Sequence, residues 1–236
     1  MTDKPVRVRI APSPTGYFHV GSARTALFNW LFARQHDGKF VVRVEDTDRS
    51  RYDPEAVADL VASLRWLGLD WDEGPEVGGD YGPYIQSERL EQYQHYADWL
   101  VDHGYAYLCY CSPERLARIR DEQRRQKQDI GYDRHCRHLT AGQRSKYESE
   151  GIRPVVRLKA PLEGQTSFRD LVYGTITVEN QTLEDLVLLK SDGFPTYHLA
   201  VVVDDHLMEI SHIMRGDEWL PSVPQRVLIY DALGWE

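Results

Sequence analysis

The chain contains 236 residues, of which 42% are hydrophobic and 28% are charged. This size and composition suffice for one large domain or two small ones with a substantial core, and they exclude an unfolded chain. No apolar run approaches the roughly 18 residues that a membrane-spanning helix needs, and residues 1–4 lead into a strand without a signal-peptide region. We therefore expect a cytoplasmic protein without a membrane partner.

Charge is distributed unevenly along the chain. The formal net charge of −9 argues against a nucleic-acid partner, because Lys and Arg supply the contacts to phosphate. Residues 112–159 nevertheless hold 13 Lys and Arg against 7 Asp and Glu, so a basic stretch lies in the middle of an acidic protein. Taken alone, a solvated charged helix over residues 115–127 is the simplest explanation of this surplus.

The first turn connects a strand expected at residues 6–11 to a helix expected from about Ser22 to Arg34. Two prolines and two glycines restrict its path, so the N-terminal amides of the helix, capped by Ser22, would face a phosphate above the strand end. His19 can donate to a phosphate oxygen, and Gly21 lets a flat ring or a phosphate approach the backbone. An ordinary turn with an incidental histidine is the competing interpretation.

A second buried strand is expected at residues 40–45, and Asp53 and Pro54 are typical of the start of a helix that ends at Gly68. The order strand, helix, strand, helix predicts parallel pairing and a doubly wound sheet, whose ligands lie over the carboxyl ends of the strands. The carboxylates of residues 45–48 follow such an end, where they either bind a ligand or cap nearby amides.

The middle of the chain contains potential metal ligands. Cys109 and Cys111 are separated by one residue, and after 24 further residues Cys136 and His138 have the same spacing. On extended strands alternate side chains share a face, so each pair can direct both ligand atoms to one point. Three thiolates and one imidazole suit a structural Zn2+ site. The alternatives are three buried thiols with a surface histidine, or a substitute ligand from Tyr132 or His135.

The remaining elements complete an α/β protein with an insertion. We expect a helix at 87–102 capped by Ser87, strands at 155–159 and 175–178, a sheet that resumes at 186–189 and continues through 199–203, a strand at 209–214 and a helix at 222–233. Residues 104–189 are interpreted as an inserted α+β domain with little core of its own, which a metal would help to hold in shape. The domain that it interrupts would then comprise residues 1–103 and 190–236.

Several of these stretches match one family. The segment R-x-A-P-S-P-T-G-x-x-H-V-G-S-A, which begins at Arg9, resembles the signature of the class I glutamyl-tRNA synthetases, whose H-x-G element is the local form of the class I HIGH motif. E-D-T-D at residues 45–48, G-P-Y-I-Q-S-E-R-L at 82–90 and P-T-Y-H-L-A before V-V-D-D are similar to segments of the same family. The resemblance implies a Rossmann-like catalytic domain whose insertion binds the acceptor stem of tRNA.

The resemblance also implies roles for individual residues. The catalytic element comprises His19, Gly21 and Ser22, and ATP with Mg2+ is bound by Thr15, His19, Gly21 and Trp219. The glutamate site comprises Arg9, Ala11, Ser13, Glu45, Tyr197 and Arg215. Within it, Arg9 and Arg215 bind the side-chain carboxylate and Glu45 binds the ammonium group, whereas a core role is the alternative for Tyr197. Val201 stands where some relatives have an asparagine that contacts the substrate, and some bacterial members carry zinc in the insertion.

By this resemblance, the expected function is ATP-dependent ligation of L-glutamate to tRNA(Glu) through a glutamyl-adenylate, by a monomer. A tRNA-modifying enzyme similar to glutamyl-queuosine-tRNA(Asp) synthetase and a non-catalytic, zinc-containing tRNA-binding module are the alternatives. In the family a lysine-rich KMSKS-type motif and an anticodon-binding region follow the G-W-E segment, at which this chain ends. We therefore expect an N-terminal portion of a longer synthetase that activates glutamate poorly, if at all, by itself.

Overall fold

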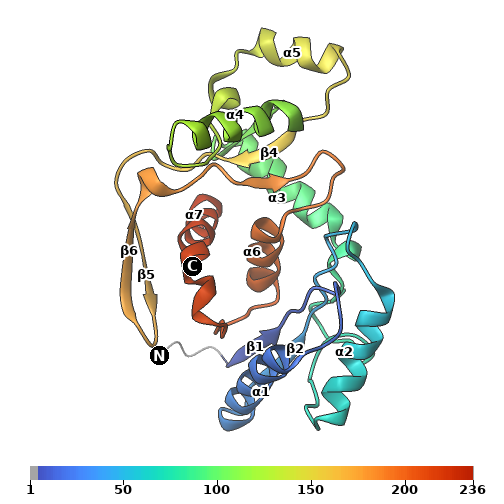
Figure 1. Cartoon of the computed structure of the whole chain (residues 1–236). Coiled ribbons are helices and arrows are strands. Elements are labelled where there is room, and N and C mark those ends of the chain that lie inside the picture. Colours follow the sequence, from blue (N-terminus) through green and yellow to red (C-terminus); the bar gives the residue numbers. More distant parts are fainter. Residues whose placement is uncertain (1–4, 236) are drawn as a thin grey trace. The chain divides into compact units, whose positions relative to one another are not determined.

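The computed structural model describes residues 5–235, which form two compact units (Figure 1). The first unit comprises the described residues up to Gln92 together with Ala200–Pro221, and the second comprises Tyr93–Leu199 and the described residues from Ser222 onward. The domain boundaries expected after residues 103 and 189 do not coincide with these divisions and remain a prediction. No helix among residues 5–235 is long and apolar enough to cross a membrane.

The first unit is built on two parallel strands, β1 (Arg7–Ile10) and β2 (Lys39–Val42). Helix α1 (Val20–Gln35) connects them and α2 (Pro54–Trp66) follows β2, which confirms the predicted element order and the parallel pairing. Asp53 is the N-cap of α2, because its Oδ1 accepts a hydrogen bond from the Glu55 amide at 2.9 Å. The start of this helix is therefore as the sequence predicts.

Side chains alternate between the two faces of the strand pair. One face is apolar and packs against α1 and α2, in a core formed by Val8, Ile10, Ala26, Ala33, Phe40, Val42, Val44, Leu60, Val61, Leu64, Leu69 and Trp71. The opposite face carries Arg7 and Arg9 from β1 and, just beyond β2, Arg43 and Glu45, all of them buried. The same two strands thus support an apolar core and a buried ionic surface.

The predicted strand at residues 199–203 is wrong, because these residues lie in helix α6 (Tyr197–Leu207). All five side chains are at most 1% exposed. A helix that is buried all round has no amphipathic period, so a short apolar run that contains three valines is indistinguishable from a buried strand by pattern alone.

The predicted strand at 209–214 is also absent from the described chain. Helix α6 is followed by Glu209 in a left-handed conformation (φ 54°). The amides of Ser211 and His212 then both donate to the carbonyl oxygen of Arg7, at 2.9 and 3.3 Å. The Ser211 hydroxyl also accepts a hydrogen bond from the Arg7 amide at 2.7 Å, so these contacts of the segment with β1 are all to the backbone of Arg7, and it does not form a ladder with the strand.

The predicted continuation of the parallel sheet at 186–189 is wrong as well. Strand β7 (Val187–Leu189) pairs antiparallel with β4 (Val155–Leu158), which pairs antiparallel with β3 (Ala106–Cys109), all in the second unit. In the described part of the first unit, parallel pairing involves β1, β2 and two isolated bridges, Val41 with Glu73 and Val44 with Ile85. The structure is accordingly mixed α/β.

The second unit arranges helices and a hairpin around this antiparallel sheet. A short 3-10 helix of the first unit, η1 (Gln86–Glu88), precedes α3 (Leu90–Asp102). The remaining elements of the second unit are α4 (Pro113–Arg125), η2 (His135–His138), α5 (Ala141–Ser149), β5 (Gln165–Asp170), β6 (Gly174–Glu179), η3 (Asn180–Thr182) and α7 (Val223–Leu233). Strands β5 and β6 form the long ribbon in Figure 1. The predicted helix at 87–102 is thus a 3-10 turn followed by α3, while the strands predicted at 155–159 and 175–178 and the helix predicted at 222–233 are confirmed.

Candidate functional site

The turn between β1 and α1 is organised by His19. This residue, and not Ser22, is the N-cap of α1, because the Nδ1 atom of its imidazole accepts a hydrogen bond from the Gly21 amide at 3.1 Å. A Cβ atom on residue 21 would lie 3.0 Å from the ring, so a side chain there would crowd it. Gly21 therefore leaves room at the backbone for the ring of His19, whereas the approach of a ligand ring or a phosphate to Gly21 remains a prediction.

These contacts determine the tautomer of the neutral imidazole. Since Nδ1 accepts from Gly21, the proton of the neutral ring is on Nε2. Nε2 lies 3.2 Å from the Ser22 hydroxyl, to which it donates. Ser22 thus holds the N–H group of an exposed His19 side chain in a defined direction at the start of α1.

The turn itself is attached to the end of β2. The carbonyl oxygens of Pro12 and Pro14 accept hydrogen bonds from the amides of Glu45 and Asp53, at 3.0 and 2.9 Å. Within the turn the Thr15 amide donates to the carbonyl oxygen of Ser13 at 2.9 Å. Ala11 is half-buried, whereas Ser13 and Thr15 are exposed. Ala11 and Ser13, which flank Pro12 in the chain, are therefore held near Glu45.

Beside this turn, charged residues of β1 and of the end of β2 meet the carboxylates of α6. Arg9 donates to Asp205 through Nε and Nη2 at 3.0 and 2.9 Å. Arg43, which is fully buried, donates to Asp205 at 2.8 Å and to Glu45 at 2.9 Å. Together, Arg9, Asp205, Arg43 and Glu45 form one continuous chain of charge-assisted hydrogen bonds, which we call the ion network.

Asp204, the neighbour of Asp205 on α6, extends the ion network. It accepts from Arg89 at 2.7 Å and from Gln86 at 2.8 Å, and it lies 3.6 Å from Nε of Arg43. Three guanidinium groups therefore face three carboxylates, and the buried charges balance.

The ion network shifts the pKa values of its members in different directions. Burial opposes the charge of Arg43, but the carboxylates of Asp205, Asp204 and Glu45 outweigh it and raise the pKa of this guanidinium. Burial also works against ionised Asp205, yet Arg9 and Arg43 together lower the pKa of its carboxyl group. For Glu45, burial dominates over the attraction of Arg43 and Arg9, and its pKa is raised. Burial thus makes Glu45 harder to ionise, although Arg43 and Arg9 favour its charged form.

The other predicted substrate contacts lie elsewhere. Arg215 is placed over the ring of Trp219, with its guanidinium carbon 3.7 Å from the ring centroid, and lines a groove of about 520 Å3 that Arg24 and Phe28 of α1 also line. Tyr197 is the first residue of α6 and belongs to the second unit. A joint clamp by Arg9 and Arg215, and the contact of Tyr197 with a substrate, remain predictions.

Sequence reasoning missed the partners of Arg9 and Glu45. Arg43, Arg89, Asp204 and Asp205 complete the ion network, although none of them is a predicted site residue. Two signals were available: the alternation of Arg43 and Glu45 at a strand end, and an acidic pair directly after a run of apolar residues. Neither signal names its partner, since Arg9 and Asp205 are 196 residues apart.

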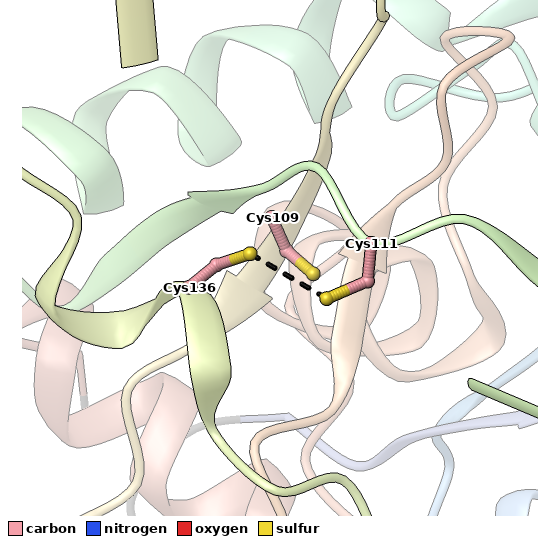
Figure 2. A group of neighbouring side chains, drawn as sticks. All are labelled: Cys109, Cys111 and Cys136. Carbon is pink, nitrogen blue, oxygen red and sulfur yellow. Dashed lines mark hydrogen bonds between the residues drawn. The ribbon is translucent and has the colours of Figure 1, made fainter. Parts of the chain in front are cut away.

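The three cysteines of the second unit form a compact group. Figure 2 shows their sulfur atoms directed toward one another, and all three lie within 4.8 Å of each other. Cys111 and Cys136 are 3.5 Å apart at Sγ, and hydrogen bonds from Cys111 and Cys136 lower the pKa of Cys109. The spacing of the cysteines therefore predicted a true cluster.

The fourth member of this cluster differs from the expected one. Cys136 and His138 lie in a 3-10 helix and not on a strand, and His138 is exposed and outside the group of sulfur atoms. Instead the hydroxyl of Tyr132 lies 3.3 Å from Sγ of Cys109 and 3.6 Å from Sγ of Cys111. Of the substitute ligands considered, Tyr132 is therefore the one at the thiols, whereas His135 is exposed.

Comparison with known proteins identifies the family. The profile described as "tRNA synthetases class I (E and Q), catalytic domain" matches residues 5–236. The chain belongs to this family. It is a class I synthetase catalytic domain of mixed α/β structure, which confirms the resemblance of the first turn.

Individual relatives are named more specifically. The chain is 60% identical over 230 residues to a glutamate–tRNA ligase of Dehalococcoides mccartyi, and 58% identical over 231 residues to one of Borrelia duttonii. These alignments cover 98% of this chain and 46% of each relative, so the chain spans about half the length of the curated relatives it matches. A crystal structure of a glutamate tRNA ligase from Elizabethkingia meningosepticum, in complex with its amino acid, matches with a TM-score of 0.94 at 42% identity. That match covers 99% of this chain and 48% of the other.

Proposed function

We propose that the protein carrying this chain is a glutamate–tRNA ligase, which joins L-glutamate to tRNA(Glu) through a glutamyl-adenylate at the expense of ATP. The ion network is the observation that carries the proposal, because a free amino acid with an acidic side chain offers two carboxylates and one ammonium group. Arg9 supplies a cation and Glu45 an anion beside the same turn. The names of the relatives agree with this substrate.

The reaction needs no nucleophile from the protein. The α-carboxylate of glutamate attacks the α-phosphorus of ATP and pyrophosphate leaves. A ribose hydroxyl of the terminal tRNA adenosine then attacks the acyl carbon, and AMP leaves. The contribution of the chain is positioning and charge: Arg9 binds the side-chain carboxylate, Glu45 binds the ammonium group, and the Nε2–H of His19 would donate to a phosphate oxygen in place of the Ser22 hydroxyl.

The nucleotide would lie over the start of α1. Thr15, His19 and Gly21 are at this turn, and Ser22 already directs Nε2 of His19. Mg2+ bound with ATP would neutralise part of the phosphate charge. In this proposal Arg215 and Tyr197 complete the amino-acid site and Trp219 the nucleotide site.

The second unit is proposed to contain the insertion that binds the acceptor stem, within a doubly wound catalytic domain. Helix α4 supports this role, because it has no buried residue and carries Arg115, Arg118, Arg120, Arg124 and Arg125. Such a surface suits phosphate contacts. The protein would act as a monomer in the cytoplasm.

We further propose a structural Zn2+ ion held by Cys109, Cys111, Cys136 and Tyr132. Three thiolates and a phenol oxygen form a complete tetrahedral donor set, and Arg115, 3.3 Å from Sγ of Cys111, would offset part of its negative charge. The ion would attach the end of β3, at Cys109, to η2, at Cys136.

The test is ATP–pyrophosphate exchange by the protein encoded by the complete gene, with glutamate or glutamine as amino acid and with or without tRNA(Glu). We expect exchange with glutamate, and we expect His19→Ala to reduce its rate by about 100- to 1,000-fold. Absence of exchange and of tRNA charging, with tRNA binding retained, would leave a zinc-containing tRNA-binding module.

A further inference from the structure

Arg9 and Glu45, the two proposed binding groups of opposite charge, are connected through side chains that have no assigned role. Asp205 holds Arg9 by a two-point contact, and Arg43 holds both Asp205 and Glu45. This connection runs from β1 through α6 to the end of β2 and is buried throughout. The relative placement of Arg9 and Glu45 therefore depends on Arg43 and Asp205.

We propose that Arg43 and Asp205 are positioning residues for the recognition of a free acidic amino acid. They hold a cation for its side-chain carboxylate and an anion for its ammonium group at a fixed separation, without touching the substrate themselves. This inference rests on the proposed function, because it takes Arg9 and Glu45 as the groups that bind glutamate.

Arg7, a second buried arginine on β1, shows how a purely structural ion pair differs from the contacts of Arg9. Arg7 donates through Nη1 and Nη2 to Glu73 at 2.6 and 3.0 Å, and through Nε to the carbonyl oxygen of Met208 at 2.9 Å. All three of its nitrogen atoms have partners within the chain. Arg9 instead contacts Asp205 through Nε and Nη2, a geometry that leaves Nη1 for another carboxylate.

Arg43 has the geometry that a bridge requires. Its guanidinium meets Glu45 through Nη2 and Asp205 through Nη1, and its Nε faces Asp204. A lysine ammonium is a compact point charge on a flexible stem and cannot hold three carboxylates in one plane. Replacement of this residue by lysine therefore keeps the charge and removes the alignment.

Arg43 also acts on the charge of Glu45. The groups that face Glu45 are Arg43, Arg9 and Asp205, and burial already raises the pKa of this carboxyl group. Loss of the Arg43 charge would raise it further. Glu45 would then bind an ammonium group only at higher pH, an effect that a role confined to folding would not produce.

The experiment uses the protein encoded by the complete gene and measures KM for glutamate and for ATP in pyrophosphate exchange. For Arg43→Lys and Asp205→Asn we expect KM for glutamate to rise about 10- to 100-fold, because a small misplacement of binding groups is costly. KM for ATP should change less than about twofold. In Arg43→Gln the acid limb of kcat/KM for glutamate should move to higher pH. Asp205→Glu, which keeps the charge, should recover part of the loss.

Arg7→Lys is the matched control, because it perturbs another buried arginine of the same unit, which lies on β1 two residues from Arg9 and pairs with Glu73. The inference is overturned if the folded Arg43 and Asp205 variants have the KM for glutamate and the pH profile of this control. If the Arg43 variants do not fold, the comparison of KM for glutamate between Asp205→Asn and Asp205→Glu provides the test. An unsubstituted protein that shows no glutamate-dependent exchange would overturn the proposed function instead, so the two failures are distinguishable.

Discussion

The ion network of the first unit and the thiol cluster of the second accommodate buried charge in different ways. In the ion network, three guanidinium groups and three carboxylates neutralise one another, and the partners of single hydrogen bonds are 162 and 196 residues apart. In the thiol cluster, Cys111 and Cys136 are 25 residues apart, and the nearby cation is Arg115. One site is thus assembled by the fold of the whole unit, and the other by a short stretch of chain that suits a metal ion.

The largest expected effect is on the ion network. Asp205→Asn leaves Arg9 and Arg43 with a neutral partner in a buried place, and we expect the free energy of unfolding to fall by about 3–5 kcal/mol. Urea unfolding of the variant and of the unsubstituted protein at neutral pH measures this loss. A loss below about 1 kcal/mol would show that water or neighbouring groups compensate for the missing charge.

The carboxylate of Asp205 should also make the free energy of unfolding depend on pH in the acid range. The pKa of Asp205 is below the usual 3.8 of an aspartate, so its contribution to stability is complete above pH 3.8 and is lost as the pH falls below that value. Glu45, whose pKa is raised, acts with the opposite sign and loses its contribution as the pH rises above its usual 4.5. Acid unfolding below pH 3.8 should therefore be less steep in Asp205→Asn than in the unsubstituted protein, and equal slopes would contradict this assignment.

The thiol cluster should respond to metal. Metal analysis of the purified protein should find zinc, and Tyr132→Phe should weaken its retention against a chelator by about 10- to 100-fold, or roughly 1.4–2.7 kcal/mol. His138→Ala is the matched control and should retain zinc normally. The reverse result would return the fourth ligand position to His138.

A contact formed by neighbours in the sequence should contribute less than the ion network. Asp53→Ala removes the N-cap of α2, and we expect a loss of about 1 kcal/mol in the free energy of unfolding. Asp53→Ser retains a capping oxygen and should restore most of it. Chemical denaturation of both variants makes the comparison.

The smallest effect is expected for an exposed ion pair. Asp121 and Arg124 lie one helical turn apart on α4, with side chains 58% and 61% exposed. Asp121→Asn should change the free energy of unfolding by less than about 0.5 kcal/mol, because water and salt screen this pair. A loss comparable to that of Asp205→Asn would mean that burial does not distinguish the two sites.

Features that depend on neighbouring residues were predictable from the sequence. The cap at Asp53, the parallel order of the first two strands, the strands that became β4 and β6, and the cysteine cluster all follow from spacing and local chemistry. The predicted N-cap of α1 is wrong by three residues, because the imidazole of His19, and not the Ser22 hydroxyl, accepts the hydrogen bond from a backbone amide at the start of the helix. That choice depends on how closely a ring can approach Gly21, which composition does not show.

By itself, the sequence determined the membership of the class I synthetases, through the long match around the first turn, and the place of the thiol cluster, through its regular spacing. Only the tertiary structure decided that residues 199–203 are helical, that the hydroxyl of Tyr132 lies at the thiols, and that Arg43 and Asp205 join Arg9 to Glu45. The physical reason is distance along the chain. A buried charge must have a partner, but which partner it meets depends on how strands and helices far apart in sequence pack together.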